Sequence, residues 1–171
     1  MSIDLGLLVL RALVGLVLAA HGAQKLFGAF DGPGMKGFSG WMAKMGLQPA
    51  QLWGFMGGLG EFGGGLLLAL GLLNPLGSLG AIGAMAMAIA LAHWSKGFWS
   101  SKGGYEFPLV LLVTSATLGL VGPGAYSLDA LLGIALPAWL FWVGIVGVAL
   151  VVGYGLSLTR QQAAIAQQTT S

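Results

Sequence analysis

The sequence predicts an all-α protein, an integral membrane helical bundle, and three observations lead to this fold class. Of the 171 residues, 57% are hydrophobic and only 7% are charged, whereas a soluble domain has about 25% charged residues. Five apolar segments each approach the ~20 residues that a helix needs to cross the hydrocarbon core of a bilayer. The basic residues between these segments sort to one side of the membrane if all five segments cross it.

The first predicted span covers residues 3–27. The chain opens with MSIDLGLLVLR, which has an acid where a signal peptide has basic residues, and the apolar run continues beyond Arg11. We therefore expect a retained helix. Asp4, Arg11 and Lys25 are spaced by multiples of seven residues and share one face. His21 falls on the same side, and lipid disfavours such a polar face, so we expect it to point into the bundle.

The second predicted span, residues 51–73, begins after Pro49 and stops at the breaker Asn74-Pro75. It contains the run GGLGEFGGG, in which Glu61 stands among glycines. Small residues allow two helices to approach closely in lipid, so this side of the helix is predicted to be a packing surface. By helical spacing, the glycines on the side of the carboxylate are Gly54, Gly57, Gly58, Gly64 and Gly65.

Three further spans follow. The third is predicted at residues 76–94, and the fourth, at residues 105–121, is short and stops at the turn GPG. The fifth, at residues 137–158, opens with a proline, which the first turn of a helix tolerates. We therefore expect a four-span core, one additional transmembrane helix and a polar mobile tail, in residues 1–133, 134–158 and 159–171.

The basic residues predict the topology. Outside the spans, the opposite side carries only the acids Asp4 and Asp129. By the positive-inside rule, the basic side is cytoplasmic, so we expect a multi-pass protein of the bacterial inner membrane with its N-terminus outside and its C-terminus inside. The residues of the basic side are Lys25, Lys36, Lys44, Lys96, Lys102 and Arg160.

Features near the two membrane boundaries agree with this topology. Residues 35–45 place Met35, Phe38 and Met42 on one helical face, which predicts a short helix lying in the interface; an irregular loop is the alternative. Tryptophan and tyrosine residues are expected as interfacial belts at both boundaries. These residues are Trp41, Trp53, Trp94 and Trp99 on the basic side and Tyr126, Trp139 and Trp142 on the other.

A buried ion pair between Arg11 and Glu61 is the central structural prediction. At 1.5 Å per residue, Arg11 lies roughly 12 Å from the outer end of its helix and Glu61 roughly 18 Å from the outer end of the antiparallel second helix. An extended arginine spans that difference, and an unpaired glutamate at this depth would be protonated. Two interpretations remain open: a purely structural clasp, or a clasp that also contacts a ligand such as a proton or a quinone carbonyl.

A second set of polar residues is expected near the cytoplasmic boundary. These side chains could hold a polar headgroup and exchange protons near neutral pH, although the same residue types are common as anchors at helix ends. Both interpretations stay open. The candidate pocket residues are His21, Lys25, His93, Trp94, Tyr105 and Glu106.

Other classes of site are disfavoured. The chain has no cysteine, which excludes thiol redox chemistry and cysteine-bound metal or iron–sulfur centres in this chain. No H-x-x-E or E-x-x-H spacing occurs, so no metal site is predicted. The few basic residues are dispersed and no phosphate-binding loop is present, so we expect no nucleic-acid or nucleotide partner.

Several ordered blocks carry a family resemblance: HG-x-x-K-L-F-G at residues 21–28, E-x-x-G-G-x-L-L-x-x-G at 61–71 and GGYEFP at 103–108. Together with flanking segments, over residues 5–133, they resemble the DoxX family of bacterial and archaeal membrane proteins. The resemblance implies a membrane bundle with four core spans and an association with redox chemistry, because relatives include small membrane subunits of a thiosulfate:quinone oxidoreductase. The positions that match the family's polar motifs are Arg11, His21, Gly22, Lys25, Glu61, Gly64, His93 and Glu106.

The resemblance and the polar residues together lead to one functional hypothesis and two alternatives. We expect a quinone-interacting or accessory subunit of a membrane oxidoreductase system, with no covalent cofactor and with a bound quinone as the candidate ligand. A non-enzymatic scaffold or lipid-binding protein is the main alternative. A small transporter is less favoured, because no internal repeat or pair of broken helices is evident.

Overall fold

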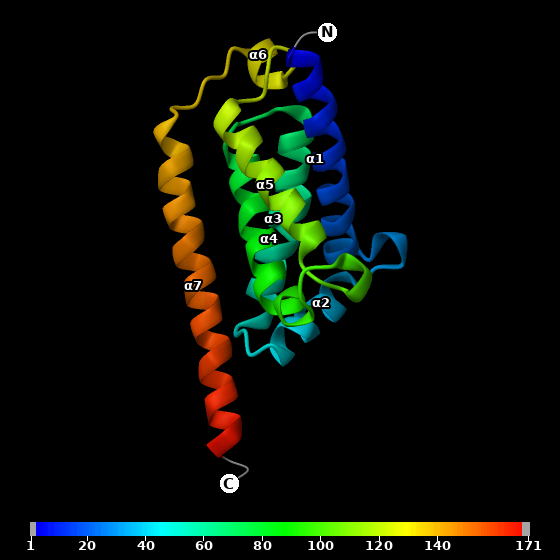
Figure 1. The fold of residues 1–171 in the computed structure, drawn as a ribbon, viewed down its shortest axis with the longest axis vertical. Helices are drawn as coiled ribbons and strands as arrows, with labels where there is room; N and C mark the ends of the chain where they lie inside the picture. Colours follow the sequence, from blue (N-terminus) through cyan, green and yellow to red (C-terminus); the bar gives the residue numbers. More distant parts are fainter. Residues whose placement is uncertain (1–2, 169–171) are drawn as a thin grey trace.

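The structure is a computed structural model that describes residues 3–168. Four helices pack side by side with alternating direction, and a fifth runs along their outside (Figure 1). In the described residues the regular elements are helices and no strand occurs, so the predicted all-α bundle is confirmed. The four core helices are α1 (Ile3–Phe27), α3 (Ala50–Leu70), α4 (Leu76–Ala88) and α5 (Glu106–Val121), and the outer helix is α7 (Trp139–Gln168).

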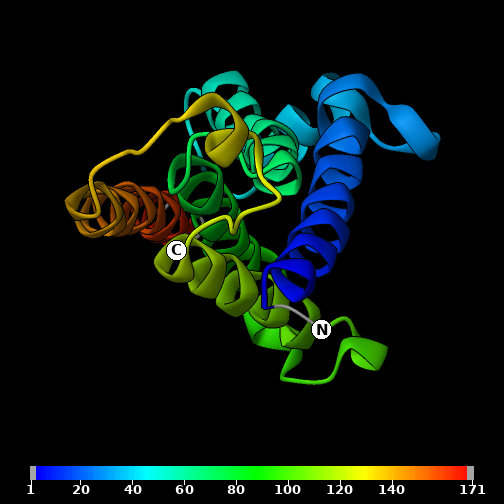
Figure 2. The same cartoon turned by 90° about the horizontal axis from the view of Figure 1, so that it is seen from above.

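The core helices follow one another around the bundle. Helix α3 packs between α1 and α4, and α5 closes the bundle against α4 and α1. Helix α7 packs against α4, on the side away from α1 (Figure 2). Two short helices mark the ends of the bundle, and we name the ends after them: α2 (Gly34–Lys44) at the lower end in Figure 1 and α6 (Leu128–Leu132) at the upper end.

The helix boundaries agree with the predicted spans at most positions. The first span is residue for residue the predicted one. The second ends early, at Leu70, because Gly71 adopts a left-handed conformation with φ 64° and its N–H caps the helix. The third span is not α-helical throughout: α4 is followed by a π turn, Ile89–His93, and a 3₁₀ turn, Trp94–Lys96.

The predicted polar tail from residue 159 is helical over its described part. Helix α7 continues without a break to Gln168. The segment TRQQAAIAQQ is rich in alanine, glutamine and arginine, which favour helix, and it contains no glycine or proline. Polarity alone therefore did not predict the end of the helix. Residues 169–171 lie outside the described residues.

Three helices are long and apolar enough to cross a membrane by length and composition, namely Ile3–Phe27, Leu76–Lys96 and Trp139–Ile165, among the residues that the structure describes. Helix α5 is apolar but shorter, and α3 has 21 residues, among them Glu61 and many glycines. Both lie alongside the three longer helices in one bundle (Figure 1). If the longer helices span the bilayer, α3 and α5 must lie within it as well.

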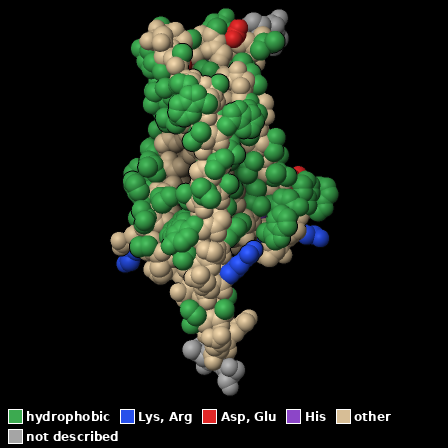
Figure 3. Space-filling view, turned by 90° about the vertical axis from the view of Figure 1, so that its left-hand side faces the viewer, with side chains coloured by type: hydrophobic (Ala, Val, Ile, Leu, Met, Phe, Trp, Pro, Cys, Tyr) green, Lys and Arg blue, Asp and Glu red, His purple; other side chains and the backbone are tan. Residues whose placement is uncertain are grey.

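The lysine side chains gather at one end of the bundle, as predicted. On the face around α7, hydrophobic side chains cover the length of the bundle and lysine and arginine side chains gather toward the α2 end (Figure 3). Asp4 and Asp129 belong to elements at the α6 end. A bilayer therefore fits around the middle of the bundle. Which end faces the cytoplasm remains a prediction.

The predicted helix at residues 35–45 is confirmed as α2. Its buried face packs Phe38 and Met42 against Leu47 and Trp53, so it is part of the protein core. Trp53 is only 7% exposed and is therefore a core residue, not the interfacial anchor that its position in the sequence suggested. Trp94 and Trp99 are exposed at the same end, as an interfacial belt requires.

Candidate functional site

Glu61 pairs with Lys25, and the predicted Arg11–Glu61 pair is wrong. The Nζ atom of Lys25 donates a hydrogen bond to Oε1 of Glu61. Glu61 is 1% exposed, while 24% of the Lys25 side chain is accessible. The cation that pairs with Glu61 thus comes from the last turn of α1. The inward-facing side of α1 predicted from the sequence includes Lys25, but the estimate of depth in the membrane assigned Arg11 as the partner.

The register of α1 against α3 explains the correction. Close backbone contacts place Gly15 against Ala69 and Gly22 against Phe62, so the first turns of α1 project beyond the end of α3. At 1.5 Å per residue, Arg11 then lies roughly 18 Å along the axis from the level of Glu61. The depth estimate failed because it assumed that the outer ends of the two helices were level.

Arg11 instead binds the carboxyl end of α3. Its Nη1 donates to the carbonyl of Ala69 at 2.9 Å, and its Nη2 donates to the carbonyl of Tyr126. The last carbonyls of a helix lack intrahelical donors and carry partial negative charge. Arg11, which is 2% exposed, therefore joins α1, α3 and the connection to α6.

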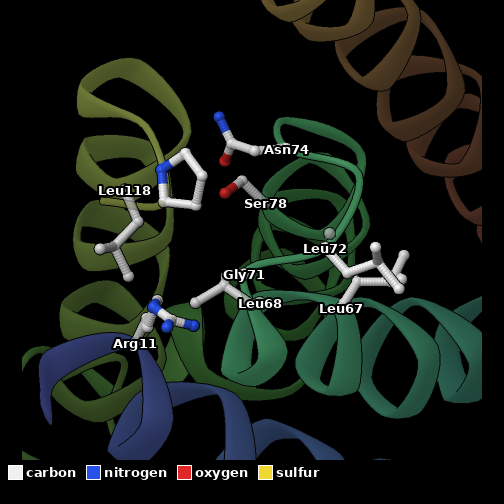
Figure 4. Close-up of a pocket in the computed structure, with 10 residues that line it drawn as sticks. Arg11, Leu67, Leu68, Gly71, Leu72, Asn74, Ser78 and Leu118 are labelled. Atoms are coloured by element: carbon white, nitrogen blue, oxygen red, sulfur yellow. The ribbon is translucent and has the colours of Figure 1, made fainter. Parts of the chain in front are cut away.

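The cavity beside Arg11 is too small for a ligand. It has a volume of about 10 Å³ and lies among Arg11, Gly71, Ser78 and Leu118 (Figure 4). A space of this size holds at most one water molecule. Arg11 and its partners therefore form a structural junction. A separate space of about 340 Å³ at this end is lined by Asn74, Asp129 and residues of α5 and α7, and both carboxylate oxygens of Asp129 are occupied by backbone N–H groups.

Asp129 is the residue of this junction that sequence reasoning missed. Its two carboxylate oxygens accept hydrogen bonds from the N–H groups of Leu73 and Asn74, at 2.8 and 2.9 Å. The side chain of Ser127 accepts from the N–H of Ala130 and caps α6. Serine directly before an apolar helical segment is an N-cap signal, and it could have predicted α6 and the position of Asp129.

The α2 end contains a larger cavity, of about 220 Å³. Lys25, Glu61 and His93 line it together, and its other walls come from α2, α3, α4 and the π turn. The Oε2 atom of Glu61 is buried and has no hydrogen-bond partner in the described residues. The remaining lining residues are Phe38, Trp41, Met42, Gly57, Ala84, Met87, Ala88, Leu91 and Ala92.

His93 is positioned by the π turn that ends the third span. Its Nδ1 lies 2.7 Å from the carbonyl oxygen of Gly103. A carbonyl oxygen only accepts, so Nδ1 carries the hydrogen and Nε2 of the neutral ring is an acceptor. π turns within α-helices are frequent at functional sites, and this one places a titratable ring in the wall of the cavity.

The other four predicted pocket residues lie elsewhere. His21 is exposed and its ring meets the edge of Phe107, with 5.9 Å between ring centroids. Trp94 stacks on Tyr105 at 5.3 Å. The Oε2 atom of Glu106 accepts hydrogen bonds from the N–H and the hydroxyl of Ser100, which fixes the loop before α5. Only Lys25 and His93 of the six predicted residues line the cavity, and Glu61 joins them.

The predicted glycine surface of α3 is divided among three neighbours. Gly65 and Gly58 face α1, Gly64 faces Gly77 and Ala81 of α4, and Gly54 and Gly57 face Ser39 and Phe38 of α2. A Cβ atom at Gly65 would lie 2.6 Å from the backbone nitrogen of Ala19. Close packing at α1 is what brings Lys25 beside Glu61.

Two glycines of α1 complete this packing, and the sequence analysis did not single them out for it. A Cβ atom at Gly15 would lie 2.5 Å from the backbone of Ala69, and one at Gly22 would collide with the backbone nitrogen of Phe62. Within residues 3–168 no three histidine, aspartate or glutamate side chains gather as a metal site. The cavity therefore offers an ion pair, a histidine and apolar walls.

Comparison with protein-family models matches residues 6–94 to the DoxX family. The chain belongs to the DoxX family. The matched range is more than half of the 171 residues and contains Lys25, Glu61 and His93, while α5, α6 and α7 of this DoxX protein lie beyond it. No curated protein matches the chain, and no solved structure matches it.

Proposed function

We propose that this DoxX-family protein binds a quinone headgroup in the cavity at its α2 end and acts as a quinone-interacting or accessory subunit of a membrane oxidoreductase system. The observation that supports this is a buried carboxylate oxygen, Oε2 of Glu61, without a partner in a cavity of about 220 Å³. A buried polar atom of this kind requires a reason. A ligand with a hydrogen-bond donor, such as the hydroxyl group of the reduced quinone (quinol), would supply the partner.

The chemistry of the lining suits a small ring with polar edges. Lys25 donates one of its three ammonium hydrogens to Glu61 and has others for a carbonyl oxygen of the ligand. Phe38, Trp41 and Met42 provide apolar walls for the ring. The cavity is smaller than the ~300–1,000 Å³ of pockets for drug-sized ligands, which matches one ring and leaves the rest of the ligand outside.

Glu61 and His93 supply proton exchange beside that ring. The hydroxyl groups of a quinol would donate hydrogen bonds to Oε2 of Glu61 and Nε2 of His93, two acceptor atoms of this chain that could take up its protons on oxidation. The electrons would pass to a partner oxidoreductase, because this chain has no cysteine for a thiol relay. The chain's own part is to bind, orient and exchange protons with the headgroup.

The test compares two histidine variants of the protein in lipid nanodiscs. Quinone is quantified after organic-solvent extraction, and added quinone is titrated by quenching of the tryptophan fluorescence, to which Trp41 in the wall of the cavity contributes. His93→Leu should weaken binding, whereas His21→Leu, which changes a histidine on the outer surface, should not. Wild-type protein that retains no quinone and binds none on titration would refute the proposal.

A membrane scaffold is the second candidate function. Helix α7 contacts the core through α4, and its outward face exposes Trp142, Val146 and Leu150. Such a face can accept lipid or another membrane helix. If quinone binding fails in the experiment above, scaffolding becomes the better explanation of this fold.

A further inference from the structure

We propose that the apolar groove between α4 and α7 holds the isoprenoid tail of the same quinone, and this inference rests on the proposed function. The groove has a volume of about 340 Å³ and is lined by α2, α3, α4 and α7. Its lining contains no charged side chain. It therefore matches an apolar chain and offers nothing to a headgroup.

The groove adjoins the headgroup cavity. Four residues line both spaces: Met42, Gly57, Ala84 and Met87. Glycine and alanine form a low wall, and methionine side chains are flexible enough to move aside. A tail that leaves the cavity over Gly57 and Ala84 enters the groove directly.

Helix α7 contacts α4 at some positions along the groove and leaves space at others. At Gly144 a Cβ atom would collide with Leu79, and at Gly155 it would lie 3.0 Å from Met87 and Trp53, so α7 is in close contact at both positions. Between them, a Cβ atom at Gly147 would meet no atom within 4 Å. The interval from residue 144 to 155 corresponds to roughly 16 Å of helix. Within this interval Val148 reaches α4, where a Cβ atom at Gly83 would lie 3.6 Å from its side chain, so the open space lies beside Val148, at Gly147, and can take several carbons of a chain.

The polar end of the site selects the tail of a quinone over the acyl chain of a bilayer lipid. A phospholipid keeps its headgroup at the membrane surface, whereas the unpartnered Oε2 atom of Glu61 is buried. An occupant of both spaces needs a small ring that enters the protein and one long apolar chain. Isoprenoid quinones have this form.

The experiment fills the groove from α7 without touching the cavity. Gly147→Leu places a side chain in the open space, and Gly153→Leu is the matched control, because it is also unobstructed and does not line the groove. Each protein is titrated in nanodiscs with a benzoquinone that carries a decyl tail and with the same ring without a tail. Variants are compared for one compound at a time, since the two compounds partition differently into lipid.

Gly147→Leu should weaken binding of the decyl compound about tenfold, a loss of about 1.4 kcal/mol, and should leave the tail-less ring unaffected. Gly153→Leu should change neither. Equal decyl binding by Gly147→Leu and wild type, or equal weakening of both compounds, would overturn the tail assignment while the proposed function stands. If wild type binds neither compound, the proposed function fails, and this inference fails with it.

A measurement on the wild type covers the case in which Gly147→Leu does not fold. A photoreactive group at the far end of the decyl tail should crosslink to peptides of α4 and α7. Crosslinks confined to α1 and α5 would refute the groove as the site of the tail.

Discussion

The two ends of this bundle use similar residues for different purposes. At the α6 end, two Arg11 nitrogens donate to carbonyl oxygens and both Asp129 oxygens accept backbone N–H groups. The buried Nε atom of Arg11 has no partner among the described residues, but the cavity beside Arg11 could hold only one water molecule. At the α2 end, Glu61 has one paired and one unpaired oxygen beside a cavity of about 220 Å³. Buried charge in a membrane protein is therefore no indicator of function by itself. Unused hydrogen-bonding capacity together with space is a better one.

The largest expected effect is the loss of the junction at the α6 end. Asp129→Ala leaves the N–H groups of Leu73 and Asn74 without their acceptor and should destabilise the protein by about 3 kcal/mol. Asp129→Asn keeps one acceptor oxygen and should lose about half as much. Thermal unfolding in detergent measures both. If Asp129→Ala unfolds at the wild-type temperature, α6 does not anchor the connection between α3 and α4.

The next largest effect is expected for a variant that disturbs the register of α1 against α3, which places Arg11 at the α6 end and Lys25 at the α2 end. Gly22→Ala puts a methyl group against the backbone of Phe62, and the strain should cost about 2 kcal/mol. Gly6→Ala, on the same helix, meets no atom within 4 Å and serves as the control. Equal unfolding temperatures for the two variants would show that α1 and α3 are not in the register described.

A smaller stability effect is expected for the ion pair at the α2 end. Glu61→Gln keeps an oxygen that can accept from Lys25, and the Lys25 ammonium can still reach solvent because 24% of its side chain is accessible. The loss should therefore be about 1 kcal/mol, on the order of one weakened hydrogen bond. Quinone binding should nevertheless weaken. Asp129→Asn, the matched acid-to-amide change, should lower the stability of the protein more and leave quinone binding unchanged. A Glu61→Gln protein that binds quinone as wild type does would remove Glu61 from the site.

The variants expected to affect stability least are surface cysteines, and they show which end of the bundle faces the cytoplasm. Because the chain has no cysteine, single cysteines can be introduced at two exposed positions, Ser101→Cys at the α2 end and Tyr126→Cys at the α6 end. An impermeant thiol reagent added to intact cells should label only the second, and both should be labelled after lysis. The reverse pattern would place the N-terminus in the cytoplasm.

Individual residues show how far sequence reasoning reached. The spacing of polar residues along α1 correctly predicted that Arg11 and Lys25 point into the bundle, because helical periodicity is a local property of the sequence. Glu61 was correctly expected to be buried and ion-paired, but its partner was assigned from helix ends that are not level. His93 and Lys25 were correctly expected at the same level of the bundle. His21 was expected to point inward but is exposed, because a residue at the edge of a broad helical face can point either way.

The amino-acid sequence by itself determined the membrane class, the helical spans and the gathering of the lysine residues at one end, because hydropathy, helix breakers and charge act locally along the chain. The tertiary structure decided the register of α1 against α3, the partner of Glu61 and the gap between α4 and α7. Lipid solvates every apolar face about equally well, so hydropathy does not predict which helix faces pack together or in which register. They are set where backbones meet at Gly15, Gly22 and Gly65 and where α7 touches α4 only at intervals, which are properties of pairs of helices.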